Sequence, residues 1–169
     1  RAVQSVQDLS TLLRGAVADL RSVLGELQPS LIKKTDFGDL LGTLAAGYTG
    51  RTSTTVAVKI GAKVTFAPKT QETLYRLCRE AVTNIAKHAD ATQVWIELAR
   101  KSGGIEIIIR DNGRGMDRDM IPTGRFGLSM MEQQAAWVGA ELRIVSQIGH
   151  GTKVTVFVPG ESILVGGIL

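Results

Sequence analysis

The residues best suited to chemistry fall in four short motifs that occur in one order along the chain. They are REAVTNIAKHA at 79–89, DNGRG at 111–115, GRFGL at 124–128 and GHGT at 149–152. Each motif alone is weak, because glycine clusters usually mark ordinary turns and an asparagine in a helix is usually solvated. Their order and spacing carry the signal.

The first motif ends a helix expected over residues 70–88, with Thr70 as its N-cap. The apolar stripe that packs is Leu74, Leu77, Ala81 and Ile85, and the polar stripe that can face a ligand is Arg76, Glu80, Asn84 and Lys87. Asn84 offers a neutral oxygen to a hard cation such as Mg²⁺, and Lys87 can supply a point charge to a phosphate. A solvated polar face is the simpler interpretation of this helix on its own, with Glu80 paired to Arg76 or Lys87.

The second motif begins where an apolar strand ends, at Asp111. A carboxylate fixed there can accept a hydrogen bond from the exocyclic amine of adenine, which guanine lacks at that position. Gly113 and Gly115 would let the backbone approach a flat ring, and Met116 would pack on the base. The alternative is a plain β-turn between two strands.

The third motif opens another helix through Gly124, Phe126, Gly127 and Leu128. Free backbone N–H groups at a helix start can bind a phosphate without a dedicated lysine. Arg125 can also contact phosphate, although a solvated arginine fits the pattern equally well. The polar stretch at 117–123 is interpreted as a short nucleotide lid.

The elements that must position these motifs follow from periodicity. A helix capped by Asp36 and ending near Gly50 is expected, as is a helix at 127–138. Strands are expected at 54–60, 93–100, 105–111, 141–146 and 153–158. Because strands and helices do not alternate, and residues 102–104 join two strands as a hairpin, we predict a two-layer α+β sandwich. Its sheet should be mixed, mostly antiparallel, with helices on one face.

Composition bounds the class of protein. The chain has 169 residues, 44% hydrophobic content and a net charge of +4, enough for one sizeable core. Aromatic content is only 5% and the basic residues are scattered, so no nucleic-acid partner is expected. The single cysteine, Cys78, is expected to be a buried core thiol in a reducing compartment. We expect a cytoplasmic chain, whose full-length parent can still be membrane-anchored.

Taken together, the four motifs resemble the ATP-binding catalytic domain of sensor histidine kinases, which has the Bergerat fold and shares it with DNA gyrase B. The resemblance covers about 9–159 and is closest to the subfamily whose partners are response regulators with helix-turn-helix output domains. It implies ATP and Mg²⁺ as cofactors. It also implies metal and catalytic roles for Asn84 and Glu80, His88 near the phosphates or ribose, and Thr152 bonding near Asp111 and the adenine.

The resemblance assigns residues 1–33, with their leucine seam, to the second helix of a dimerisation hairpin. Residues 34–160 are the ATP-binding domain and 161–169 a tail, which is either an edge strand or a disordered end. A homodimer is implied for the full-length protein. The implied reaction moves the γ-phosphoryl group of ATP to a histidine on the chain's own phosphoacceptor helix, then to a response regulator. His88 and His150 both lie in nucleotide motifs, so we expect ATP binding without autophosphorylation by this chain alone.

Three other functions compete with this one. The first is a serine kinase resembling anti-sigma factors, which the leucine seam at 1–33 disfavours. The second is a non-catalytic nucleotide sensor or dimerisation module, which would bind ATP without phosphoryl transfer. The third is an ATPase that uses Glu80 as its base and would turn over repeatedly with water.

Overall fold

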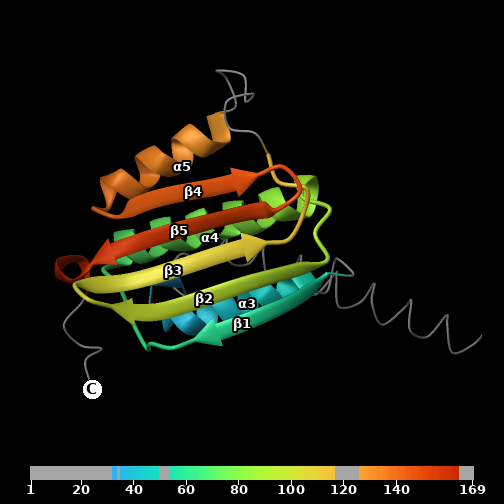
Figure 1. Ribbon diagram of the computed structural model, residues 1–169. Coiled ribbons are helices and arrows are strands. Elements are labelled where there is room, and N and C mark those ends of the chain that lie inside the picture. Colours follow the sequence, from blue (N-terminus) through green and yellow to red (C-terminus); the bar gives the residue numbers. More distant parts are fainter. Residues whose placement is uncertain (1–31, 34, 50–53, 117–125, 164–169) are drawn as a thin grey trace, which may run out of the picture.

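The computed structural model describes residues 32–33, 35–49, 54–116 and 126–163, and within them it shows a five-stranded sheet covered on one face by helices (Figure 1). The elements in chain order are α3 (Phe37–Thr49), β1 (Thr55–Ile60), α4 (Pro68–His88), β2 (Gln93–Lys101), β3 (Gly104–Asp111), α5 (Phe126–Trp137), β4 (Glu141–Gln147), β5 (Gly151–Pro159) and the short 3₁₀ helix η1 (Gly160–Ser162). The predicted two-layer α+β sandwich is confirmed.

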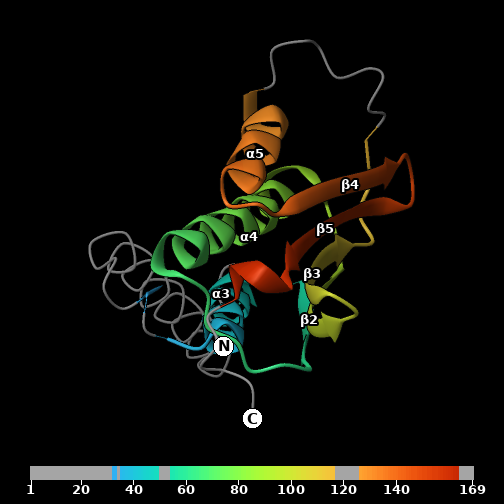
Figure 2. The ribbon, with the colours of Figure 1, turned by 90° about the vertical axis from the view of Figure 1, so that its left-hand side faces the viewer.

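The sheet has the strand order β1-β2-β3-β5-β4. β1 pairs with β2 in parallel, and every other pair is antiparallel, including the predicted hairpin of β2 and β3. Figure 2 shows α3, α4 and α5 on the same side of the sheet. The sheet is therefore mixed and mostly antiparallel, as the strand pattern predicts.

Alternation along the strands places the core between the sheet and the helices. On β2, Val94, Ile96 and Leu98 are fully buried, and they pair with Asp111, Ile109 and Ile107 on β3. The same inner face continues on β5 through Val154, Val156 and Val158. Because side chains alternate between the two faces of a strand, the odd-numbered residues of β2 point the other way.

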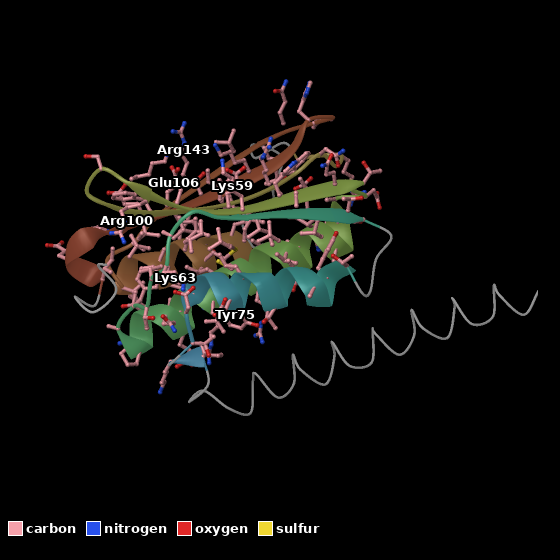
Figure 3. All side chains as sticks on the ribbon, turned by 90° about the horizontal axis from the view of Figure 1, so that it is seen from below. Lys59, Lys63, Tyr75, Arg100, Glu106 and Arg143 are labelled. Carbon is pink, nitrogen blue, oxygen red and sulfur yellow. The ribbon has the colours of Figure 1, made fainter. Side chains whose placement is uncertain are left out.

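The outer face of the sheet mixes many charged side chains with a few apolar ones. Figure 3 shows Lys59, Glu106 and Arg143 on the side of the sheet away from the helices. Arg110 lies 4.1 Å above the ring of Trp95 and 3.9 Å from the carboxylate of Glu97. This face needs no second layer, since its charges are solvated or paired across strands.

The helices α3 and α4 differ in how their N-termini are capped. Asp36 caps α3 as predicted, because its Oδ1 accepts the N–H of Gly38 at 2.9 Å. The prediction that Thr70 caps α4 is wrong. That helix begins at Pro68 with Ala67 as N-cap and no side-chain cap, and Thr70 is buried in its first turn. Proline at the first helical position loses nothing, since its missing N–H would be unpaired there anyway.

The chain before α4 is fastened by Gln71, which is fully buried. Its Oε1 accepts the N–H of Phe66 at 2.8 Å, and its Nε2 donates to the carbonyls of Ile32 and Thr35. The first bond joins the helix to the residue just before its N-cap, and the other two join it to a segment more than 30 residues earlier in the chain. Gln71 therefore fastens these two preceding segments to the first turn of α4, without capping the helix.

Several predictions concern residues outside the described ranges. The helix expected over residues 1–33 lies almost wholly there, and so does the end of the tail at 164–169. At the start of that tail, Ile163 forms an isolated antiparallel bridge with Phe66. Among the described helices, none is both long and apolar enough to cross a membrane.

The thiol of Cys78 is buried in the core, as expected from its place among apolar residues. Burial raises the pKa of Cys78 to about 12. The thiol is therefore protonated at neutral pH and chemically inert.

Candidate nucleotide-binding site

A cavity of about 480 Å³ opens between α4, α5 and the ends of β3, β4 and β5. Its apolar lining is Ala81, Ile85, Ala89, Ile109, Met116, Leu128, Met131, Ile144 and Val154. Its more polar lining is Asn84, His88, Asp111, Arg114, Gly115 and Thr152. The size is typical of small-molecule sites, and so is a mostly apolar wall with a few convergent polar groups.

Asp111 is the most constrained polar group in the cavity. Only 5% of the residue is exposed, and its Oδ1 accepts the N–H of Gly113 at 2.7 Å. Its Oδ2 is buried and has no hydrogen-bond partner among the described residues. Burial raises the pKa of Asp111, while backbone N–H groups of Gly113 and Thr152 partly oppose the shift. A buried carboxylate oxygen without a partner is costly, so this atom is suited to a donor brought by a ligand.

The two glycines after Asp111 are required by close backbone contacts within the protein, whether or not a ligand is bound. A Cβ on Gly113 would lie 2.2 Å from the carbonyl oxygen of Ala89, and one on Gly115 would lie 1.9 Å from that of Gln147. Gly115 also has φ +64° and lines the cavity, whereas Gly113 is buried behind Asp111. The predicted approach to a flat ring therefore has a structural counterpart at Gly115 only.

Asn112 holds the loop in place, a role that sequence reasoning missed. Its Oδ1 accepts the N–H groups of Thr92 and Gln93 at 3.1 and 2.9 Å, and its Nδ2 donates to the hydroxyl of Thr92 at 2.9 Å. The N–H of Arg114 donates to the carbonyl of Ala89 at 2.7 Å. The loop that carries Asp111 is thus tied to the end of α4 and the start of β2.

The C-terminal half of α4 forms one wall of the cavity. Asn84 and His88 line the cavity, one helical turn apart. Glu80 and Lys87 are exposed on the same helix and are not among the lining residues. Arg76 pairs with Glu72 at 2.9 Å, and not with Glu80. The structure therefore brings Asn84, but not Glu80 or Lys87, into the lining of the cavity that also contains Asp111.

The remaining candidates divide between the cavity and the undescribed segment. Met116, Leu128 and Thr152 line the cavity. Phe126 and Gly127 are the first two residues of α5, as predicted for the helix start. Gly124, Arg125 and the stretch at 117–123 lie outside the described residues.

Comparison with known proteins identifies the class. Residues 69–162, more than half of the chain, match the family described as histidine kinase-, DNA gyrase B-, and HSP90-like ATPase. The chain belongs to this family. Its relatives are sensor histidine kinases, and this confirms the resemblance of the four motifs to the ATP-binding catalytic domain of that class. The narrower resemblance, to the subfamily that partners response regulators with helix-turn-helix output domains, stays a prediction.

Two curated relatives cover nearly all of the chain. An uncharacterized sensor-like histidine kinase of Chloroflexus aurantiacus is 30% identical over 96% of this chain and 29% of its own length. The sensor protein VraS of Staphylococcus aureus is 28% identical over 92% of this chain and 45% of its own length. The chain thus spans less than half of either relative.

Solved structures agree on the fold. The histidine kinase domain of the blue-light activated kinase EL346 of Erythrobacter litoralis matches with a TM-score of 0.62 and 27% identity, over 75% of this chain and 62% of that one. The ATP binding domain of PrrB from Mycobacterium tuberculosis matches with a TM-score of 0.61 and 25% identity, over 75% of this chain and 95% of that one.

Proposed function

We propose that this chain binds ATP in the cavity, with the adenine against Asp111 and the phosphates toward Asn84 and the start of α5. One observation carries the proposal: Asp111 and Asn84 come from different elements and line one cavity. Support also comes from the family match and from the PrrB structure, which is described as an ATP binding domain.

The chemistry of Asp111 favours adenine over guanine. Its unpartnered Oδ2 is an acceptor, and the exocyclic amine of adenine is a donor. Guanine presents a carbonyl oxygen at the same position, which would meet a carboxylate oxygen inside a buried site. Leaving two acceptors face to face costs far more than a lost contact in water.

The residues present also fit a magnesium ion held mainly by the substrate. Mg²⁺ in phosphate sites takes one or two protein oxygens and keeps several waters. Asn84 is half-buried in the cavity wall and can provide such an oxygen, while exposed Glu80 lies one turn before it, outside the cavity lining. When bound, the ion supplies charge neutralisation to the phosphates.

The chain's own residues would then orient the phosphate tail. His88 lines the cavity one turn beyond Asn84, and Leu128 in the first turn of α5 lines it as well. The free backbone N–H groups of that first turn would bind phosphate. Arg125 and exposed Lys87 are further candidates for phosphate contact. In phosphoryl transfer, positioning and charge stabilisation account for most of the catalysis, so no acid–base pair within the cavity is needed.

We further propose that the full-length protein transfers the γ-phosphoryl group to a histidine and relays it to a response regulator with a helix-turn-helix output domain. The names of its relatives support a kinase over an isolated ATPase. Exposure of Glu80 outside the cavity also weighs against its use as a general base for water. Dimerisation through residues 1–33 belongs to the same proposal.

Replacing Asn84 with alanine is expected to remove most of the Mg²⁺-dependent gain in ATP affinity. The loss should be roughly tenfold, on the scale of one charge-assisted contact. Isothermal titration of ATP with Mg²⁺ and with EDTA measures it. Thr83→Ala is the matched control, since Thr83 is the half-buried neighbour outside the cavity lining. Equal Mg²⁺ dependence in Asn84→Ala and the parent chain would remove Asn84 from the metal site.

Phosphoryl transfer is tested by joining the chain to an upstream histidine-bearing helix and adding γ-labelled ATP. Acid-labile, base-stable label on that helix is expected, as for phosphohistidine. Label on a serine-bearing protein partner instead would favour the serine kinase. Binding of ATP without label on either would favour a nucleotide sensor, and repeated release of phosphate to water that Glu80→Ala abolishes would favour an ATPase.

A further inference from the structure

A hydroxyl outside the four motifs lies directly behind the base end of the cavity. Ser146 on β4 pairs with Thr152 on β5 in the antiparallel register, so their side chains share the inner face of the sheet. The two hydroxyl oxygens are 2.9 Å apart. Thr152 lines the cavity, whereas Ser146 is half-buried behind it.

Ser146 has two further hydrogen-bond partners, of which one is only a donor and the other only an acceptor. The N–H of Met116 donates to its Oγ at 2.9 Å, and its Oγ lies 3.0 Å from the carbonyl oxygen of Gly151. A serine hydroxyl has one proton to donate and two lone pairs that accept. A backbone N–H only donates and a carbonyl only accepts. All three partners are satisfied in one arrangement, in which Ser146 donates to Gly151 and accepts from Thr152.

That arrangement fixes the proton of Thr152. Its hydroxyl hydrogen points to Ser146, away from the cavity, so only oxygen lone pairs of Thr152 face the ligand. Asp111 presents an unpartnered carboxylate oxygen to the same cavity. Among the residues that the structure describes, the base end of the site therefore offers two acceptors and no hydroxyl donor.

We infer that Ser146 is a specificity-positioning residue, which makes Thr152 an acceptor and so selects a base edge that carries an amine. This inference rests on the proposed binding of ATP at Asp111. The preferred ligand group is an exocyclic amine. It can donate directly to the oxygens of Asp111 and Thr152, or together with a bridging water that donates to both of these oxygens. A purine with a carbonyl at that position is disfavoured by both acceptors.

The test compares ATP with inosine triphosphate, in which a carbonyl replaces the amine and the adjacent ring nitrogen carries a proton. Titration calorimetry with Mg²⁺ gives the ratio of the two dissociation constants for each variant. In Ser146→Ala the Thr152 hydroxyl is free to turn and donate to the carbonyl. The preference for ATP is expected to fall about fivefold or more, the scale of one hydrogen bond gained or misplaced.

Two further variants separate positioning from a merely structural role. Ser146→Thr keeps the hydroxyl and should restore the parent ratio. In a Thr152→Val background, Ser146→Ala should leave the ratio unchanged, because no hydroxyl remains to be positioned. Equal weakening of both nucleotides by Ser146→Ala, or a shift in ratio that persists without the Thr152 hydroxyl, would overturn the inference.

Thermal unfolding of each variant identifies a loss of fold. Should Ser146→Ala not fold, Thr152→Val decides by itself, since removing an acceptor from the base end must reduce the preference for ATP, and an unchanged ratio overturns the inference. If the parent chain binds neither nucleotide, the proposed function fails as well. If the parent binds ATP and the ratios do not move, only the role of Ser146 fails.

Discussion

Asp111→Asn is expected to lower ATP affinity by about 100-fold or more while the protein stays folded. The amide would place an N–H₂ group where the adenine amine needs an acceptor, so two donors would meet in a buried site. Isothermal titration of the variant and parent chains measures the loss. Asp39→Asn is the matched control, because it removes the same charge from an exposed residue of α3 that is not part of the cavity lining.

The same substitution should stabilise the nucleotide-free protein, by about 1 kcal/mol at neutral pH. Burial raises the pKa of Asp111, so the charged carboxylate costs the folded state free energy wherever it is ionised. As pH falls through the raised pKa, the folded state takes up a proton first and this cost disappears. The stability gain of Asp111→Asn over the parent should therefore be present above that pKa and shrink below it.

Denaturant unfolding of both proteins from about pH 4 to pH 8 tests this sign. Reduced affinity together with reduced stability would mean that Asp111 supports the fold and not the ligand. Unchanged ATP affinity would refute the assignment of the adenine to Asp111, whatever the stability.

Gly151→Ala is expected to have the second largest effect, because it forces apart two backbones at the base end. Gly151 has φ +79°, and a Cβ there would lie 2.0 Å from the carbonyl oxygen of Asp111. A positive φ alone costs about 1–2 kcal/mol for alanine. The collision adds to this, so we expect a loss of about 3 kcal/mol or more in unfolding free energy, together with loss of ATP binding.

Gly149 supplies a control within the same turn. Its φ is also +79°, but a Cβ there meets nothing within 4 Å. Gly149→Ala should cost only about 1–2 kcal/mol and leave ATP affinity close to that of the parent. Equal losses in the two variants, measured by denaturant unfolding, would show that backbone conformation and not contact with Asp111 explains the requirement for glycine.

Much of the fold was predictable because long periodic segments dominate it. The strands and α4 are confirmed with boundaries shifted by only a few residues, since their apolar faces follow the helix and strand periods closely. The predicted start of α4 is wrong because Thr70 has the residue type of a cap, whereas the helix begins two residues earlier at Pro68, whose fixed φ suits a first helical position. The buried ties of Gln71 could not be predicted, because they join segments that sequence patterns do not place in contact.

The candidate site likewise contains residues that sequence motifs predict and residues whose roles depend on tertiary contacts. Asn84, His88, Asp111, Gly115 and Thr152 could be proposed because they stand in recognisable motifs, and the structure brings them to one cavity. Asn112 and Ser146 were missed as positioning residues, since their roles depend on strand register and loop packing. The helix pattern also groups Glu80 and Lys87 with Asn84. Both side chains lie outside the cavity lining, because they are rotated about the axis of α4 away from the lining residues.

The most direct test of the account is a crystal structure of this chain with a non-hydrolysable ATP analogue and Mg²⁺. We predict one nucleotide that spans the cavity, with its exocyclic amine within hydrogen-bond distance of Asp111 Oδ2 and its phosphates beside Asn84. A nucleotide bound elsewhere, or one that leaves either side chain without contact, would contradict the account.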